Sequence, residues 1–292
     1  MAESAGYDLD FATLHDLDAE PDLLDGHSCA IFVGHDEYWS APMRDAVDTF
    51  VVAGGKVARF AGNFLWQTRL EDEGRRQICY KYQAKDDPLS GTGKAHLVTG
   101  AWELGPVNRP GALTFGVNAM RGVYAGVGRC VGGGSGGFTV YRSGHWAFAG
   151  AGLGYGDQLG AASRVFGYEV DGLDYRMDDG LPFPMGTDGG SLDITILAMG
   201  LATNIEADNR IWGETQYIGV SDAAFKARSL YGAVTSETLD ACERGNGMIV
   251  HWSKGNGEIF TAATCEWVAG LARGDIQVQT VTRNVLDRFG AR

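Results

Sequence analysis

The sequence predicts an α/β fold in which a layer of parallel strands near the N-terminus precedes a β-rich, glycine-rich middle region. Two observations indicate this class. Residues 29–33 form an apolar run of strand length, and a helical pattern at 43–51 and a short apolar run at 56–60 follow it. Further along, short strand-like runs alternate with glycine turns. We expect a single domain over residues 1–292 with three parts: a βαβ core at 7–63, a β-rich insertion at about 100–190, and closing strands and helices at 191–292.

The first expected elements build the core. Residues 7–11 have the pattern of a short strand. Ser40 is the expected N-cap of the helix at 43–51, Pro42 lies in its first turn, and Ala53-Gly54-Gly55 ends it. Because the crossover of a βαβ unit is almost always right-handed, the strands on either side of this helix are predicted to be parallel. Their C-terminal ends then open on the same edge of the sheet.

Polar side chains follow both of these strands. His35, Asp36 and Glu37 come directly after the first strand, and Asn63 follows the second. Ligands of open α/β sheets bind outside the carboxyl ends of the strands, so we expect these four side chains to converge there. The alternative is structural: the acids would lie near the positive end of a helix dipole, and Asn63 would cap a turn. Gly34 leaves room for a bound group and favours the functional interpretation.

The middle of the chain is predicted to be mostly strand and turn. The glycine run at 132–137 marks a loop or hinge, because glycine lacks a side chain that would restrict the backbone. Residues 165–172 have a strand pattern with an acid, Glu169, in its interior, which suggests a wet face or a site. The acidic stretch at 171–174 lacks the ligand spacing of a calcium loop and is interpreted as a solvated turn.

Periodic patterns return in the last third of the chain. The predicted elements are strands at 194–201 and 211–220, a hairpin of strands at 248–253 and 258–261, and helices at 264–272 and 278–289.

Composition excludes several classes of protein. The chain has 37 acidic and 24 basic residues, so its surface repels phosphate backbones and a nucleic-acid partner is not expected. No apolar run approaches the roughly 20 residues that a membrane span requires, and the N-terminal residues lack the pattern of a signal peptide. We therefore expect no membrane association and a cytoplasmic location. The five cysteines are scattered, which argues against a disulfide framework, and Cys29 and Cys265 are predicted to be buried and inert.

Several motifs together resemble the C-terminal domain of the large subunit of N,N-dimethylformamidase. The most specific are Gly34-His35-Asp36-Glu37-Tyr38-Trp39-Ser40 and the later Gly62-Asn63. Looser matches are His145-Trp146-Ala147-Phe148, Gly167-Tyr168-Glu169-Val170-Asp171, the run at 258–267 and Thr282-Arg283-Asn284-Val285-Leu286. The resemblance covers nearly the whole chain.

This resemblance implies a flavodoxin-like fold of the class I glutamine amidotransferase type, without the cysteine nucleophile of those enzymes. It also implies hydrolysis of small N-substituted formamides at a mononuclear Fe(III) centre. By the motif match, Glu37 is the carboxylate ligand of the iron, His35 and Asn63 are its polar neighbours, and Glu169 is a second acid that acts as general base. Hard anionic oxygen ligands suit Fe(III), which acts as a Lewis acid on an amide carbonyl or a bound water.

The family also implies two tyrosine ligands from a segment upstream of the matched region, and neither Tyr7 nor Tyr38 matches them. The expected partners are therefore a small amide substrate and a small subunit or an upstream large-subunit segment that supplies phenolates, in a homo- or hetero-oligomer. Two alternatives remain open. One is a non-catalytic ligand-binding or assembly domain that has kept the fold and lost the iron, with walls of Tyr38, Trp39, Trp66 and Trp146. The other is a metal-free enzyme that uses His35, Glu37 and Glu169.

Overall fold

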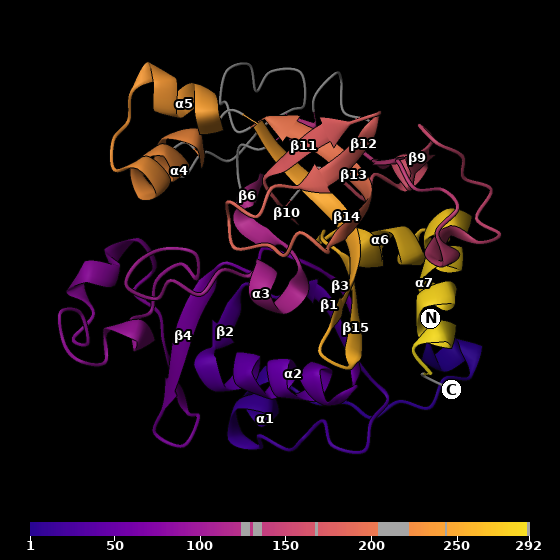
Figure 1. Ribbon diagram of the computed structural model, residues 1–292. Helices are drawn as coiled ribbons and strands as arrows, with labels where there is room; N and C mark the ends of the chain where they lie inside the picture. Colours follow the sequence, from indigo (N-terminus) through magenta and orange to yellow (C-terminus); the bar gives the residue numbers. More distant parts are fainter. Residues whose placement is uncertain (124–128, 131–135, 167–168, 204–221, 243, 291–292) are drawn as a thin grey trace.

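In the described part of the chain, a mixed sheet of eight strands is the largest sheet (Figure 1). The computed structural model describes residues 1–123, 129–130, 136–166, 169–203, 222–242 and 244–290. In spatial order the sheet contains β1 (Cys29–His35), β3 (Lys56–Gly62), β15 (Gly257–Ala262), β14 (Arg244–Lys254), β13 (Thr195–Thr203), β8 (Phe138–Val140) and β9 (Gln158–Leu159), and β7 (Arg129–Cys130) also pairs with β13.

Three smaller sheets flank this one. They are β2 (Tyr38–Ser40), β4 (Trp66–Glu71) and β5 (Arg76–Ile78); β6 (Asn118–Val123) with β10 (Val170–Gly172); and β11 (Tyr175–Asp178) with β12 (Leu181–Pro184). The α-helices are α1 (Leu14–Ala19), α2 (Ala41–Ala53), α3 (Ala112–Phe115), α4 (Asp222–Tyr231), α5 (Ser236–Cys242), α6 (Trp267–Ala272) and α7 (Ile276–Arg288). Short 3-10 helices lie at Glu3–Ala5, Lys81–Asp86, Ala95–Leu97, Trp146–Phe148 and Ala161–Ser163.

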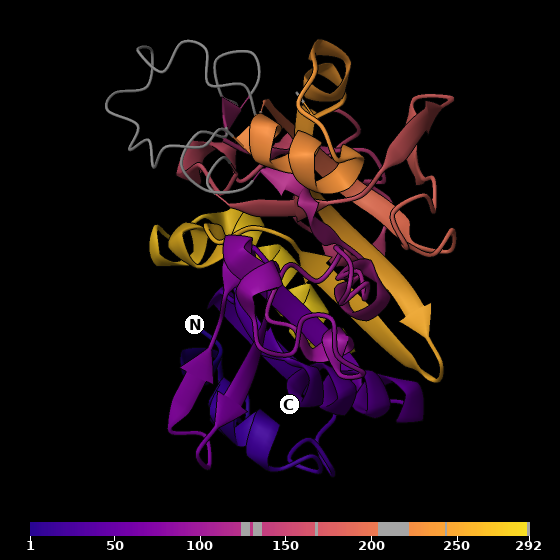
Figure 2. The same cartoon turned by 90° about the vertical axis from the view of Figure 1, so that its left-hand side faces the viewer.

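The predicted βαβ unit is confirmed. β1 and β3 are parallel, and the Ser40 side chain caps α2 by accepting a hydrogen bond from the Met43 amide. The predicted parallel layer holds only in part, because it comprises β1, β3 and β15, whereas the other strand pairs of the sheet are antiparallel. The predicted hairpin makes the sheet mixed: β15 pairs with β3 in parallel, whereas its hairpin partner β14 runs antiparallel to it. Figure 2 shows this long hairpin reaching from the middle region to the N-terminal part.

The sheet separates two hydrophobic clusters. Because side chains of a strand alternate between faces, Val57 packs with residues of α2, whereas Ala58 and Phe60 pack with residues of α6 and α7. Aromatic rings fill both clusters, and Trp39 and Trp267 are fully buried. Helices therefore pack on both faces of the sheet at β3, the strand whose C-terminal end leads into the site described below.

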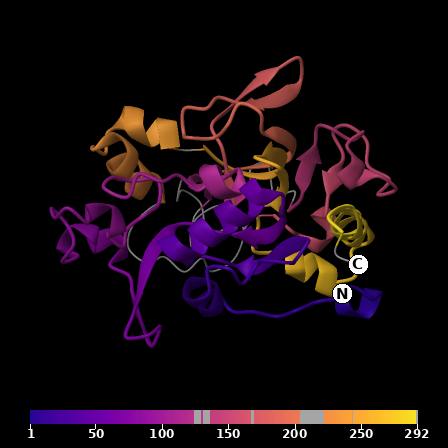
Figure 3. The same cartoon turned by 60° about the horizontal axis from the view of Figure 1, so that its bottom comes forward.

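Several expectations about elements need correction. The predicted strand at 7–11 is wrong: the segment is not in a sheet, and its apolar pattern reflects burial of Tyr7, whose hydroxyl donates to Asp287 of α7 at 2.8 Å. Figures 1 and 3 show the N-terminal segment beside α7. Of the described residues in the predicted strand at 165–172, Val170–Gly172 are the ones that lie in a sheet, and residues 167–168 lie outside the described residues. The predicted strand at 211–220 and most of the glycine run at 132–137 lie outside the described residues.

The late elements follow the sequence more closely. β13 confirms the strand predicted at 194–201, and α7 confirms the helix predicted at 278–289. The helix predicted from residue 264 begins at Trp267, because Thr264 donates its hydroxyl to the Val165 carbonyl instead of entering the helix. No helix in the described part of the chain has the length and apolar character that crossing a bilayer requires.

Candidate functional site

The site begins where β1 and β3 end side by side. In their parallel register His35 lies opposite Gly62, so the next residue, Asn63, emerges beside the imidazole. The Asn63 amide nitrogen Nδ2 is 3.4 Å from His35 Nε2. Asn63 has a φ of 67°, a left-handed conformation that asparagine tolerates better than most residues. The predicted convergence of His35 and Asn63 at the carboxyl edge of the parallel strands is therefore seen in the structure.

Glu169 reaches this edge from the middle region. Its Oε2 is 2.6 Å from His35 Nε2, although its own side chain is only 4% exposed. The main chain of Glu169 is tied to the segment after β15, because its carbonyl accepts a hydrogen bond from the Cys265 amide at 3.1 Å. The hydrogen bond to Glu169, opposed in part by burial, raises the pKa of His35 above its ordinary value. The pair is therefore arranged to hold and exchange a proton.

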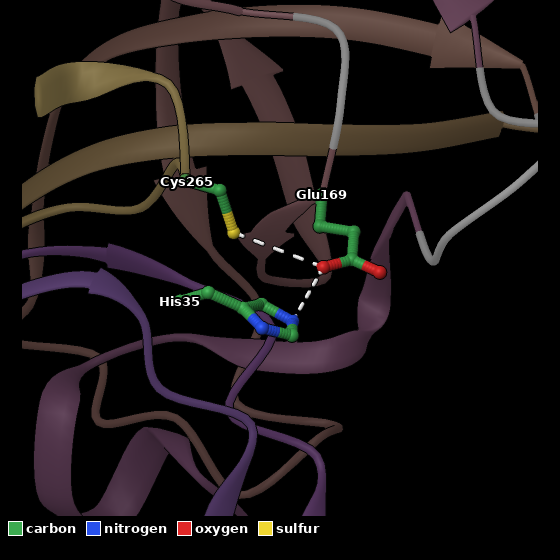
Figure 4. A group of neighbouring side chains, drawn as sticks. All are labelled: His35, Glu169 and Cys265. Atoms are coloured by element: carbon green, nitrogen blue, oxygen red, sulfur yellow. Dashed lines mark hydrogen bonds and ion pairs between the residues drawn. The ribbon is translucent and has the colours of Figure 1, made fainter. Parts of the chain in front are cut away.

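Cys265 lies beside His35 and Glu169, and Figure 4 shows the three side chains together. Its Sγ lies 3.8 Å from Glu169 Oε2. One nitrogen of His35, one carboxylate oxygen of Glu169 and the sulfur of Cys265, which are atoms of the kind that bind metal ions, all lie within 4.8 Å of one another. Burial, and then the Glu169 carboxylate, raises the pKa of the Cys265 thiol well above its usual range. The thiol therefore stays protonated, as predicted for an inert buried cysteine, but its position at the site was not foreseen.

Glu37 approaches His35 from the other side. Its Oε2 is 3.8 Å from His35 Nε2, and its Oε1 accepts a hydrogen bond from the Trp66 indole at 2.7 Å. Lys81 Nζ lies 3.7 Å from the same Oε1. Burial, followed by a hydrogen bond with Glu37, raises the pKa of Tyr38, so this phenol stays protonated. Glu37 is thus held by donors at Oε1, and its Oε2 faces the imidazole.

Asp36 does not join the site as expected. It turns inward and receives two hydrogen bonds from Arg59, at 2.7 and 2.6 Å. Arg59 also binds Asp171 at 2.9 Å, and Asp171 accepts a hydrogen bond from the Asn63 main-chain amide at 2.9 Å. Asp171, interpreted from sequence as part of a solvated turn, is therefore completely buried. The expectation of a solvated turn at Asp171 was wrong, because the positive charge of Arg59 on β3 compensates the buried carboxylate.

Charges in this inner group are balanced by contact. Burial raises the pKa of Asp36 to about 6, although Arg59 opposes the shift. Burial lowers the pKa of Arg59, but the carboxylates of Asp36 and Asp171 outweigh this and raise it, so the guanidinium stays charged. The resulting ion triad anchors the turn that presents Asn63.

The chain matches one protein family along most of its length. The family model described as "N,N-dimethylformamidase beta subunit-like, C-terminal" covers residues 1–281. The chain belongs to this dimethylformamidase-like family. No curated protein matches it. The family description names the beta subunit, whereas the resemblance seen in the sequence was to the large subunit, and that assignment stays a prediction.

The structure thus brings together His35, Glu37, Asn63 and Glu169, the residues singled out from the sequence of this dimethylformamidase-like chain. Sequence reasoning missed Lys81 and Cys265, which no motif distinguishes. Of the suggested aromatic walls, Tyr38 and Trp66 contact Glu37, but Trp39 is a core residue whose indole donates to the Asp36 carbonyl. Trp146 packs instead against His251 and Phe289.

The donor atoms at this site of the dimethylformamidase-like chain fit a small, hard cation. Glu37 and Glu169 supply carboxylate oxygens on either side of His35. The Asn63 side-chain oxygen Oδ1 is buried and has no hydrogen-bond partner among the described residues. A buried polar atom without a partner is costly unless a bound group satisfies it. The thiol of Cys265 is a poor ligand while it remains protonated, so the oxygen and imidazole donors define the preference.

Proposed function

We propose that this chain hydrolyses the C–N bond of small N-substituted formamides, or carries the site of an enzyme that does so. The close pair of His35 Nε2 and Glu169 Oε2, 2.6 Å apart beside Asn63 and Glu37, carries this proposal. A buried carboxylate that shares a proton with an imidazole at a sheet edge is suited to general acid–base catalysis on an amide. Membership of the dimethylformamidase-like family supports the choice of a formamide.

Each residue has a role in the proposed reaction. Glu169 accepts a proton from a water molecule while the oxygen of that water attacks the formyl carbon. Negative charge then develops on the carbonyl oxygen, where hydrogen bonds from His35 and Asn63 stabilise it. The C–N bond breaks as the pair of electrons moves to nitrogen, and the proton held by Glu169 and His35 passes to the leaving amine. The carbonyl re-forms from the oxyanion, and the products are an amine and formic acid, which then ionises to formate and a proton.

We further propose that Glu37 holds a mononuclear Fe(III), with the Asn63 side-chain oxygen and His35 as its polar neighbours. When bound, the ion would supply Lewis acidity toward the carbonyl oxygen or water. The remaining ligands would be tyrosine phenolates from a partner subunit or an upstream segment, so we also propose assembly into an oligomer. A fold of the class I glutamine amidotransferase type and a cytoplasmic location remain part of the same proposal.

The first test measures formate and dimethylamine released from N,N-dimethylformamide by the purified chain, alone and with its co-purifying subunits. We expect Glu169→Gln to lower turnover by about 10²–10⁴-fold, because the general base is lost. Glu237→Gln, at an exposed position on α5, is the matched control and should leave turnover unchanged. Full turnover by the Glu169→Gln variant would remove Glu169 from the mechanism.

Elemental analysis tests the metal separately. Glu37→Ala should lose bound iron while circular dichroism shows the fold intact, whereas Glu169→Gln should retain iron. Iron-free protein with full turnover would favour the acid–base site of His35, Glu37 and Glu169 without a metal. Absence of both iron and turnover in the assembled protein would favour the non-catalytic binding domain.

A further inference from the structure

Three side chains that converge at the end of β1 have the donor set of a zinc site. His35 Nε2 is 2.6 Å from Glu169 Oε2, and Cys265 Sγ is 3.8 Å from the same oxygen. Figure 4 shows the imidazole and the thiol both directed at that carboxylate oxygen. An imidazole nitrogen, a carboxylate oxygen and a cysteine sulfur are the ligands that Zn²⁺ takes from proteins.

The separations of these atoms are close to those of a tetrahedral site. Zinc binds nitrogen and oxygen at about 2.0–2.2 Å and sulfur at about 2.3 Å, so its neighbouring ligand atoms lie roughly 3.3–3.6 Å apart. The 2.6 Å between His35 and Glu169 must therefore widen, and the 3.8 Å between Glu169 and Cys265 must shorten slightly. The His35 side chain is 44% exposed, so the imidazole has room to turn outward and the ion can enter from solvent on that side.

The main chain holds the other two donors in place. The Glu169 carbonyl accepts a hydrogen bond from the Cys265 amide at 3.1 Å, and the adjoining residues Val170 and Thr264 form an antiparallel bridge. The Thr264 hydroxyl donates in turn to the Val165 carbonyl at 2.7 Å. The carboxylate and the thiol therefore come from two segments that are bound to each other, and such support fixes ligands before the ion arrives.

The charges of the ligands favour a divalent ion. Glu169 and a Cys265 thiolate together carry two negative charges, which one Zn²⁺ neutralises. The other buried carboxylates nearby, Asp36 and Asp171, are already compensated by Arg59. Sulfur as a ligand selects Zn²⁺ over Mg²⁺ and Ca²⁺, which prefer oxygen.

The thiol of Cys265 is protonated in the free protein, and zinc can replace its proton. A thiol that coordinates Zn²⁺ loses its proton outright, so binding releases protons. The S–H bond breaks, an S–Zn bond forms with the sulfur electron pair, and the proton passes to the solvent. No atom changes oxidation state, so the step needs no oxidant or reductant.

Asn63 offers a partner for the fourth ligand. The residue is 2% exposed, and its Nδ2 lies 3.4 Å from His35 Nε2. Its Oδ1 is buried without a hydrogen-bond partner among the described residues. Zinc with three protein ligands keeps a water molecule at its fourth position, and that water can donate to Oδ1. The cost of burying this amide oxygen without a partner would then be removed.

We propose that His35, Glu169 and Cys265 bind Zn²⁺ at a site separate from the iron assigned to Glu37. The two sites share no ligand, although Glu37 Oε2 lies 3.8 Å from His35 Nε2. Zinc occupies the nitrogen of His35 and the oxygen of Glu169 that exchange a proton in the proposed reaction, so it acts as a reversible inhibitor. Only this inhibition rests on the proposed function, whereas the binding of zinc does not.

Cobalt(II) tests the thiolate ligand directly, because it occupies tetrahedral zinc sites and its bond to a thiolate absorbs in the near ultraviolet. Cobalt chloride titrated into the full purified chain should produce this band, and zinc chloride should then remove it, since zinc binds more tightly. Cys265→Ser should lose the band and bind zinc more than about 100-fold more weakly in calorimetry, because loss of a residue that only supports a ligand already costs up to that much.

Cys29→Ser is the matched control. Burial also raises the pKa of the Cys29 thiol, but this residue lies at the opposite end of β1 from His35. The variant should keep the cobalt band and the zinc affinity of the wild-type chain. Circular dichroism confirms folding of each variant. A band that is absent from the wild-type chain, or that survives in Cys265→Ser, would overturn the site.

Two further variants separate this site from the iron site. Glu169→Gln removes one ligand charge and should weaken zinc binding by at least about tenfold, which tests the site even if Cys265→Ser fails to fold. Glu37→Ala should lose iron and still show the cobalt band. Loss of the band in Glu37→Ala together with its survival in Glu169→Gln would place the ion at Glu37 and overturn the separate site.

Formate release tests the inhibition. Zinc chloride at the concentration that saturates the calorimetric titration should stop hydrolysis by the wild-type chain and by Cys29→Ser, and a zinc chelator should restore it. Hydrolysis that continues at saturating zinc would overturn the inhibition. Zinc and cobalt binding at Cys265 by a chain that releases no formate in any assembly would support the zinc site and contradict the proposed hydrolysis.

Discussion

Arg59 shows how a single buried charge organises the site without belonging to it. Its side chain is fully buried, is bound to Asp36 and Asp171, and lies over the ring of Phe115, 5.0 Å from the centroid. Asp171 also accepts a hydrogen bond from the Asn63 main-chain amide. The guanidinium therefore fixes, through Asp171, the turn that follows β3. A buried ion pair contributes little net stability by itself, but it makes the loss of one partner expensive.

We expect Arg59→Met to lower the free energy of unfolding by about 3–5 kcal/mol, because two buried carboxylates would remain uncompensated. Arg76→Met is the matched control: Arg76 pairs with Glu71 on the surface, where an ion pair is worth about 0–1 kcal/mol. Urea unfolding monitored by circular dichroism measures both. Equal urea midpoints for the two variants would show that charge compensation by Arg59 does not contribute to the stability of the fold.

At the scale of elements, the site depends on a close approach of three segments around the end of β3. A Cβ atom placed on Gly62 would lie 2.6 Å from the Glu169 carbonyl oxygen and 2.8 Å from the Cys265 amide nitrogen. Both contacts are with backbone, which cannot rotate away as a flexible side chain can. Gly62 therefore permits the carboxylate of Glu169 to reach His35 from a segment distant in the sequence.

Gly62→Ala should push the segments of Glu169 and Cys265 away from β3, costing about 1–3 kcal/mol of stability. Turnover should fall more sharply than stability, because the His35–Glu169 distance changes. Gly144→Ala is the control, since a Cβ there meets no atom within 4 Å and φ is not positive. Thermal unfolding and the formate assay give the two readouts. An unchanged stability and turnover in the Gly62 variant would contradict the crowding seen at this position.

At the scale of the whole molecule, a chain of histidines ties the closing elements together. His145 Nε2 is 3.2 Å from His251 Nδ1 on β14, and His251 Nε2 is 3.1 Å from Glu258 on β15. Arg288 of α7 binds the same carboxylate at 3.0 Å. The Ala147 amide donates to His145 Nδ1, so a neutral His145 donates to His251, and a neutral His251 donates to Glu258. The bonds from the Ala147 amide to His145 and from His145 to His251 each need an acceptor nitrogen, so they require both imidazoles to be uncharged.

Stability should therefore fall in mild acid. Burial lowers the pKa of His145 to about 4, and burial lowers the pKa of His251 as well. The unfolded chain binds protons at these residues below about pH 6.5, whereas the folded chain resists them, so the free energy of unfolding is lost as pH falls from 6.5 toward 4. Partial exposure limits the slope to at most about 1 kcal/mol per pH unit for each histidine.

His145→Gln removes one of the two titrations, so its stability should depend less steeply on pH between 6.5 and 4. His27→Gln, at an exposed histidine, serves as the control and should retain the wild-type slope. Urea unfolding at a series of pH values provides the comparison. Parallel curves for wild type and the His145 variant would refute the linkage.

Local patterns were sufficient for β1, α2 and β3. Their apolar periodicity, the Ser40 cap and the glycine stop depend on neighbours within one turn or strand, and the structure confirms them. The position of His35 and Asn63 at the ends of adjacent parallel strands follows from the same local information, because a βαβ crossover has one preferred hand. The hairpin of β14 and β15 and helix α7 were predictable for similar reasons.

The sequence by itself therefore determined the α/β class, the first βαβ unit and the polar edge where it ends. Only the tertiary structure decided that the sheet is mixed, that Cys265 lies beside Glu169 and His35, that Asp36 and Asp171 turn inward to Arg59, and that Tyr7 packs on α7 outside any strand. The physical reason is that a period of two or 3.6 residues states which face of an element is buried. The period does not show which distant segment covers that face. Whether a buried charge is compensated depends on the side chains of that segment, so it cannot be read from the local pattern.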